Sequence, residues 1–204
     1  DYQRQMNKAV DQLNMCATED PKDFEALGYL GWAYAELDSA GPAGVWFDKA
    51  VAGLTELGDK KKLDVVATNR ESYWAKAFND GIRNIQDAQA AWADYSKEPS
   101  ADEKPLKDEA TAKYTAAITS LTRAKLLKPA SAMTLRNLGT VYALMGRYDE
   151  AEAVLRNGLT EAAQDTAVGQ VGEALKMVRS NKAGGLLDAK KYDEAIVYYQ
   201  ELSK

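Results

Sequence analysis

The feature that most limits the fold of this chain is an alanine that returns at a fixed interval. Ala9 and Ala43 lie 34 residues apart, and so do Ala117 and Ala151. In the stretch YDEAEAVLRNGL, Ala151 has a tyrosine three positions before it and a leucine four positions after it, and Ala195 has a similar setting. A fixed period of roughly 20 to 50 residues is typical of repeat proteins. The sequence therefore predicts a stack of similar units rather than one closed core.

A second small residue lies twelve positions before three of these alanines, as Gly31, Gly139 and Ala183. Glycine inside a helix costs about 1 kcal/mol relative to alanine, so a compensating contact is needed. We predict that each small residue lies on the first helix of a hairpin and faces the alanine of the second helix, so that the backbones approach closely. Gly146 is expected to end one such first helix in a left-handed conformation. The predicted repeat signature is Gly31, Tyr34, Ala43, Gly139, Tyr142, Ala151, Ala183 and Ala195.

The segments LGYLGWAYAEL and LRNLGTVYALM, the second followed by YDEAEAVL, resemble the tetratricopeptide repeat family. The unit of that family is a pair of antiparallel helices about 34 residues long. Pro21 and Pro129, each after a second helix, also match its pattern. The resemblance implies an all-α fold, a right-handed α-solenoid of antiparallel helical hairpins.

The period is interrupted in the middle of the chain. Gly81 matches a first helix, but Ala117 of its partner helix follows 36 residues later instead of twelve. We therefore expect an elongated central hairpin with a solvated loop, SKEPSADEKPLKDE at residues 96–109, and helix resuming near Asp108. The stretch at 56–72 is also longer than the period allows, and we expect an elongated second helix or a short extra turn with a polar loop there.

These observations divide the chain into one array of five pieces. The predicted pieces are 1–20, the second helix of a partial repeat; 24–57, a repeat; 71–129, a repeat with an insertion at about 89–112; 132–165, a repeat; and 166–204, a repeat with an elongated first helix.

Composition argues against most kinds of catalysis. The chain has no histidine, which removes imidazole ligands and the commonest general base. It also has no phosphate-binding glycine loop and no CxxC pair. Acidic pairs such as Asp149 with Glu150 are expected at helix N-termini, where they complement the helix dipole. We predict no enzyme activity, no metal site and no cofactor, and we expect the single cysteine, Cys16, to be a small buried residue.

The charge distribution limits the partners. With 26 basic and 31 acidic residues and a net charge of −5, the chain offers no basic field for nucleic acid. The run KKK at 60–62 could bind phosphate, but such a run is more often solvated surface. No apolar stretch is long enough to span a membrane, so no direct membrane insertion is expected.

A protein or peptide is the partner that the resemblance implies, held in the inner groove formed by first helices. Trp32 directly follows Gly31 on that side, whereas Trp46 and Trp74 are expected to pack. Relatives that hold a C-terminal carboxylate use several basic and asparagine side chains there, and only Arg136 qualifies here, so we do not expect that specificity. The predicted groove residues are Trp32, Ala35, Glu36, Phe78, Ile82, Ile85, Arg136, Thr140, Ala143 and Leu144.

We therefore expect a non-catalytic scaffold for protein–protein interaction. The alternative is a structural accessory subunit, held in a larger bacterial envelope complex through its outer face and insertion. The segment NRESYWAKAFNDGI is similar to segments of tetratricopeptide proteins of the bacterial cell envelope. This resemblance favours the periplasm or cell envelope over the cytoplasm.

Overall fold

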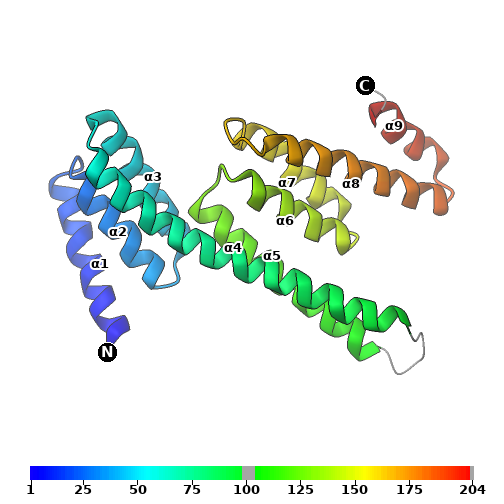
Figure 1. Ribbon diagram of the computed structural model, residues 1–204, viewed down its shortest axis with the longest axis horizontal. Coiled ribbons are helices and arrows are strands. Elements are labelled where there is room, and N and C mark those ends of the chain that lie inside the picture. Colours follow the sequence, from blue (N-terminus) through cyan, green and yellow to red (C-terminus); the bar gives the residue numbers. More distant parts are fainter. Residues whose placement is uncertain (98–103, 203–204) are drawn as a thin grey trace. The chain divides into compact units, whose positions relative to one another are not determined.

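The computed structural model describes residues 1–97 and 104–202, and all regular secondary structure in those ranges is α-helical (Figure 1). The all-α fold of stacked helices is therefore confirmed. The helices are α1 Tyr2–Glu19, α2 Phe24–Glu36, α3 Ala40–Leu57, α4 Lys60–Lys97, α5 Lys104–Leu127, α6 Ala132–Leu144, α7 Tyr148–Glu161, α8 Val168–Asp188 and α9 Tyr192–Leu202.

The helices form two compact units. The first unit consists of Asp1–Asn79 and Arg123–Pro129, and the second of Asp80–Thr122 and Ala130–Lys204. The first unit holds α1 to α3 with the beginning of α4 and the end of α5, and the second holds the remainder. Each unit has an apolar core of its own, with Phe47 fully buried in the first and Leu155 in the second.

The first helices of three hairpins end in the same way. A residue in the left-handed conformation follows α2, α6 and α8, namely Asp38, Gly146 and Lys190, each five positions before the alanine of the second helix. The prediction for Gly146 is confirmed, with φ at 72°. The left-handed residue stops the helix and turns the chain back, because it lets the following amides bond to the last carbonyls of the helix.

The glycines of the first helices lie against a large side chain of the second. A Cβ on Gly31 would lie 2.9 Å from Phe47 Cδ1, and one on Gly139 would lie 2.7 Å from Leu155 Cδ2. Both partners are four residues after the alanine of the repeat, which is one helical turn further on. Glycine at these positions therefore lets the second helix place a large apolar side chain directly on the backbone of the first.

Our expectation for residues 56–72 was wrong. The helix α3 ends at Leu57, and Gly58 in the left-handed conformation satisfies its last turn through its own amide, which bonds to Thr55 O. The next helix, α4, begins at Lys60, so the stretch at 60–72 is the start of a first helix rather than an elongation of a second. The repeat expected at 71–129 thus begins with a helix that starts eleven residues earlier.

The expected central loop was too long. Residues 96–97 and 104–109 are helical, and helix resumes at Lys104 instead of near Asp108. Ala88 on α4 and Ala110 on α5 are both fully buried, so the apolar seam of the hairpin continues into the predicted insertion at 89–112. Pro105 had suggested a loop, but it lies in the first turn of α5, where proline is tolerated because its missing N–H has no intrahelical partner. The rest of the predicted loop, at 98–103, lies outside the described residues.

The two ends of the chain differ from expectation in small ways. Cys16 was predicted to be buried, but it lies on α1 with an exposed side chain, and the buried residue of that helix is Val10. The helix α8, the elongated first helix of the repeat predicted at 166–204, begins at Val168, two residues after the predicted start, and ends at Asp188.

Candidate functional site

Two first helices, α2 and α4, run side by side in the first unit. Glu25 near the start of α2 forms an ion pair with Lys62 near the start of α4, at 2.7 Å. At the other end, Tyr73 on α4 donates a hydrogen bond to Glu36, the last residue of α2. Each contact joins residues 37 positions apart, so the two helices run parallel in a constant register.

One face of each helix lines the space between these two contacts. Residues spaced by three and four positions share a helix face. On α2 this places Glu25, Gly28, Tyr29, Trp32 and Glu36 together, over twelve residues or about 16 Å of helix. The predicted groove residues Trp32 and Glu36 therefore lie on the same face as residues that the sequence analysis did not select.

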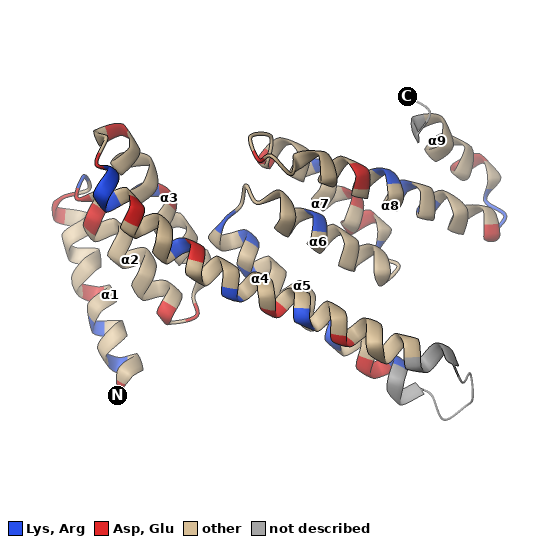
Figure 2. Cartoon of the chain, viewed as in Figure 1, with Lys and Arg blue, Asp and Glu red and all other residues tan. Residues whose placement is uncertain are grey.

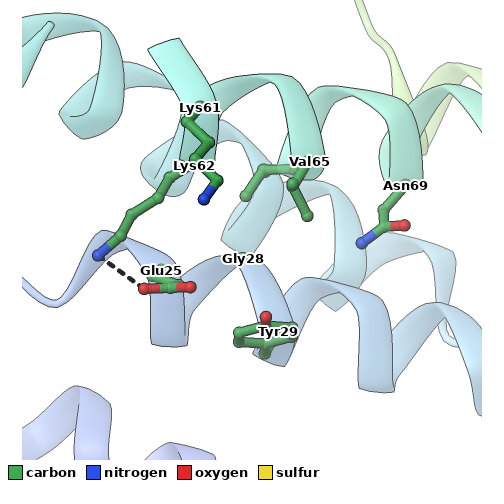
Figure 3. Close-up of a pocket in the computed structure, with 8 residues that line it drawn as sticks. Glu25, Gly28, Tyr29, Lys61, Lys62, Val65 and Asn69 are labelled. Atoms are coloured by element: carbon green, nitrogen blue, oxygen red, sulfur yellow. Dashed lines mark ion pairs between the residues drawn. The ribbon is translucent and has the colours of Figure 1, made fainter. Parts of the chain in front are cut away.

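A pocket of about 170 Å³ lies between α2 and α4 (Figure 3). We call it the α2–α4 pocket. Tyr29 and Val65 are 45% and 49% exposed, so the pocket presents apolar surface to solvent. Gly28 also lines the pocket. A Cβ at this position would overlap Val66 Cγ2, so glycine lets the two helices approach closely. The lining residues are Glu25, Gly28, Tyr29, Lys61, Lys62, Val65, Val66 and Asn69.

Some polar groups of the pocket have a partner within the chain and others do not. Lys62 is held by Glu25, and this ion pair raises the pKa of Lys62. Lys61 and Asn69, in contrast, have no side-chain hydrogen bond or ion pair within residues 1–97 and 104–202. Figure 3 shows the Lys61 ammonium and the Asn69 amide on α4, on either side of Val65. The pocket therefore offers one ammonium and one amide to a ligand.

Glu36 closes the other end of this face. Its carboxylate accepts a hydrogen bond of 2.6 Å from Tyr2 on α1 and another from Tyr73. These two bonds, the one from Tyr2 first, hold the pKa of Glu36 below its ordinary value. Burial, together with the bond to Glu36, raises the pKa of Tyr73. Glu36 therefore joins three helices and is occupied by its own chain rather than free for a partner.

The other predicted groove residues of the first unit are largely structural. Trp32 is half-buried and packs against two apolar clusters, one of them around Leu30. Ala35 packs against the larger of the two. Phe78 stacks on Trp74 with ring centroids 5.2 Å apart. Trp74 is buried, as the sequence predicted, and Trp46 is partly buried.

The predicted groove residues of the second unit lie on α4 and α6. Arg136 donates a hydrogen bond to Gln170 on α8, which is 34 positions later in the sequence and thus one repeat period away. The Thr140 hydroxyl bonds to the carbonyl of Arg136 at 2.9 Å, within its own helix. Ile82, Ile85 and Ala143 are half-buried, and Leu144 is exposed. None of the four pockets described for residues 1–97 and 104–202 is lined by these residues, so they stay predicted partner contacts.

The α4 side of the pocket was not predicted from the sequence, because residues 60–72 were not recognised as part of a first helix. A signal was present. In KKLDVVATNRESY, Lys62, Val65, Val66, Asn69 and Tyr73 follow the three-and-four spacing of one helix face. The lysine run at 60–62, which we treated as solvated surface or a phosphate patch, supplies two pocket residues.

Other ionic contacts of the described chain support the fold. Glu152 on α7 binds Arg156 of the same helix at 2.5 Å and Arg179 of α8 at 3.0 Å. Burial alone would raise the pKa of Glu152, but the bonds from Arg156 and Arg179 outweigh it and lower that pKa. Acidic and basic residues are interspersed along the helices (Figure 2). This mixing agrees with the balanced charge of the sequence.

The described ranges lack two features, a metal-binding cluster of side chains and a membrane-spanning helix. Residues 1–97 and 104–202 hold no group of three acidic or cysteine side chains placed to bind a metal ion. Within the same residues, no helix combines the length and the apolar character needed to cross a membrane.

Comparison with known proteins agrees with the repeat pattern in one part of the chain. None of the curated proteins matches the chain. A crystal structure of a thermophilic tetratricopeptide repeat protein in Thermus thermophilus is 23% identical, with 97% of this chain and 81% of that chain covered and a TM-score of 0.33. A likeness of that size carries no weight here, and the cell-envelope assignment stays a prediction. Residues 131–161, which include all of α6 and α7, match the tetratricopeptide repeat family model.

Proposed function

We propose that the chain is a non-catalytic scaffold that binds a peptide or protein segment in the α2–α4 pocket. Tetratricopeptide repeats generally mediate interactions between proteins, since stacked hairpins offer extended surfaces. The observation that carries the proposal is the pocket itself, with exposed apolar surface at Tyr29 and Val65 beside an uncommitted ammonium on Lys61. A concave, largely apolar site with a few polar groups is the usual form of a binding site.

The pocket can be tested with a matched pair of variants. Val65 and Val45 are 49% and 53% exposed, and only Val65 lines the pocket. Aspartate at either position meets solvent and should leave the fold intact. We expect peptides selected by display on the purified chain to lose at least tenfold in affinity on Val65→Asp and to keep it on Val45→Asp. Equal affinity of both variants for the selected peptides would contradict the proposal.

The second unit can be tested separately, since Arg136 and Leu144 stay predicted contacts. Arg136→Ala should weaken capture of a larger partner while the helical content measured by circular dichroism stays the same. Trp32→Ala is a poor test of binding, because Trp32 packs against two apolar clusters and its loss would disturb the fold.

Our second candidate is an accessory subunit of a larger bacterial envelope complex. The observation that favours it is the exposure of large apolar side chains on α9, since such patches often mark interaction sites. Fractionation of the native host, followed by cross-linking through Lys107, would test both the periplasmic location and the complex. Recovery of the protein only in the cytosolic fraction would remove this candidate. The exposed α9 residues are Tyr192, Ile196, Val197 and Tyr199.

A further inference from the structure

We infer that the α2–α4 pocket selects an extended peptide in which an acidic side chain lies two residues from a branched or aromatic apolar side chain. This inference rests on the proposed function and specifies the partner of that same site. It follows from three properties of the pocket: its charge, its volume and the spacing of its polar groups along α4.

The charge of the pocket favours an anionic group. Glu25 and Lys62 neutralise each other through their 2.7 Å ion pair. Lys61 lines the pocket and has no acidic partner among the residues that the structure describes. The lining therefore carries a net positive charge within a chain whose formal charge is −5. A carboxylate placed at the Lys61 ammonium completes a pair that the protein itself leaves open.

The volume of the pocket suits one side chain. A space of about 170 Å³ is many times the roughly 10 to 15 Å³ that one ordered water needs, so the pocket admits a whole side chain rather than a single solvent molecule. Tyr29 and Val65 flank this space and are nearly half exposed. A branched or aromatic side chain would remove both from water, which a small polar residue could not do.

The spacing of the polar groups fits an extended backbone. Lys61, Val65 and Asn69 are each four residues apart on α4, so they lie in one row with about 6 Å between neighbours. An extended chain covers about 3.3 Å per residue, so the distance from Lys61 to Val65 corresponds to two residues of a peptide. The Asn69 amide can both donate and accept, as a peptide backbone requires. The order along α4 is therefore acidic side chain, apolar side chain, backbone.

The experiment uses the full chain and peptides with an acetylated N-terminus and an amidated C-terminus, so that the only carboxylate is the acidic side chain. Fluorescence anisotropy compares a peptide carrying Glu and Leu two residues apart with its Gln and its Ala counterparts. The proteins are the unmodified chain, Lys61→Ala and Lys60→Ala. Lys60 is the neighbouring lysine at the start of α4 and does not line the pocket.

The expected result is a coupling between the peptide carboxylate and Lys61. Replacing Glu by Gln in the peptide should weaken binding about two- to fivefold with the unmodified chain and with Lys60→Ala, which is the range of an exposed ion pair. It should have no effect with Lys61→Ala, and the difference should shrink at high salt. Replacing Leu by Ala should weaken binding to all three proteins.

Different outcomes overturn different claims. Equal affinity for the Glu and Gln peptides would refute the acidic preference, and so would the same loss of affinity from Glu to Gln with Lys61→Ala. If binding still depends on Val65 in either case, the proposed function stands. Equal binding by Val65→Asp and Val45→Asp would refute the proposed function itself. Binding of N-acetylleucine as tight as that of the peptide would replace the peptide by a small apolar carboxylate.

Discussion

The close approach of α3 to the end of α5 can be tested at Gly44. A Cβ there would lie 3.0 Å from the carbonyl carbon of Leu126 and closer still to its oxygen. The obstacle is backbone rather than a flexible side chain, so Gly44→Ala should force the two helices apart. Gly41, three residues earlier in α3, is the matched control, because a Cβ there meets nothing within 4 Å.

The expected changes in the free energy of unfolding have opposite signs at Gly44 and Gly41. Overpacking a well-packed contact costs about 1 to 3 kcal/mol or more, and alanine regains only about 1 kcal/mol in helix propensity. Because the obstacle is backbone, the cost lies at the upper end of this range, and Gly44→Ala should destabilise the protein by about 2 kcal/mol or more. Gly41→Ala should stabilise it by about 0.5 to 1 kcal/mol, because no contact opposes the gain.

The assay is thermal unfolding of both variants, followed by circular dichroism at 222 nm. For a chain of this length, each kcal/mol shifts the midpoint by about 2 to 4 °C, so the two variants should differ by about 4 °C or more. A Gly44→Ala protein as stable as the unmodified chain would refute the close approach of these helices. So would an equal loss of stability in Gly41→Ala.

Three further predictions concern individual contacts. The pKa of Glu36 is lowered in the folded state, so the contribution of its carboxylate to the free energy of unfolding is complete above the unfolded pKa of about 4.3 and is lost as pH falls through the folded pKa. The stability lost on Glu36→Gln, measured from urea midpoints, should therefore be larger at pH 6 than at pH 3. Glu152→Ala should cost about 1 to 3 kcal/mol because two arginines each lose one acceptor, whereas the exposed Glu173→Ala should change urea stability by less than about 1 kcal/mol. Gly139→Ala should lower the midpoint by overpacking, and Gly184→Ala, where a Cβ meets open space, should not.

Much of the fold could be predicted from local repetition. Gly139 and Ala151 define a hairpin by their own spacing, and the left-handed Gly146 between them is legible because glycine favours that conformation. The equivalent turn at Lys190 carries no such signal, and Asp38 carries a weaker one, since aspartate adopts a positive φ more often than most residues but far less readily than glycine. Repetition therefore identifies a hairpin best where the turn residue is of a type that favours the left-handed conformation, as glycine does.

The site was harder to predict because it depends on contacts between hairpins. The sequence placed Trp32 on the inner side, but it could not show that the indole packs against two clusters. It also could not show that Glu36 is occupied by Tyr2 and Tyr73, since these residues come from two other helices. Residue types on one helix indicate which way a side chain points, whereas its availability to a partner depends on neighbours that the helix alone does not specify.

Two glycines one turn apart explain how the fold and the pocket arise together. Gly31 on α2 receives Phe47 of α3, and Gly28 on the same helix receives Val66 of α4. The segment LGYLG thus lets α2 contact two neighbours closely, and the second contact sets the floor of the pocket. A side chain at Gly28 would move α4 and alter the register that Glu25 and Lys62 share. Substitution there would change stability and binding at once, whereas exposed Val65 and Lys61 change the pocket alone, which makes them the informative positions for binding.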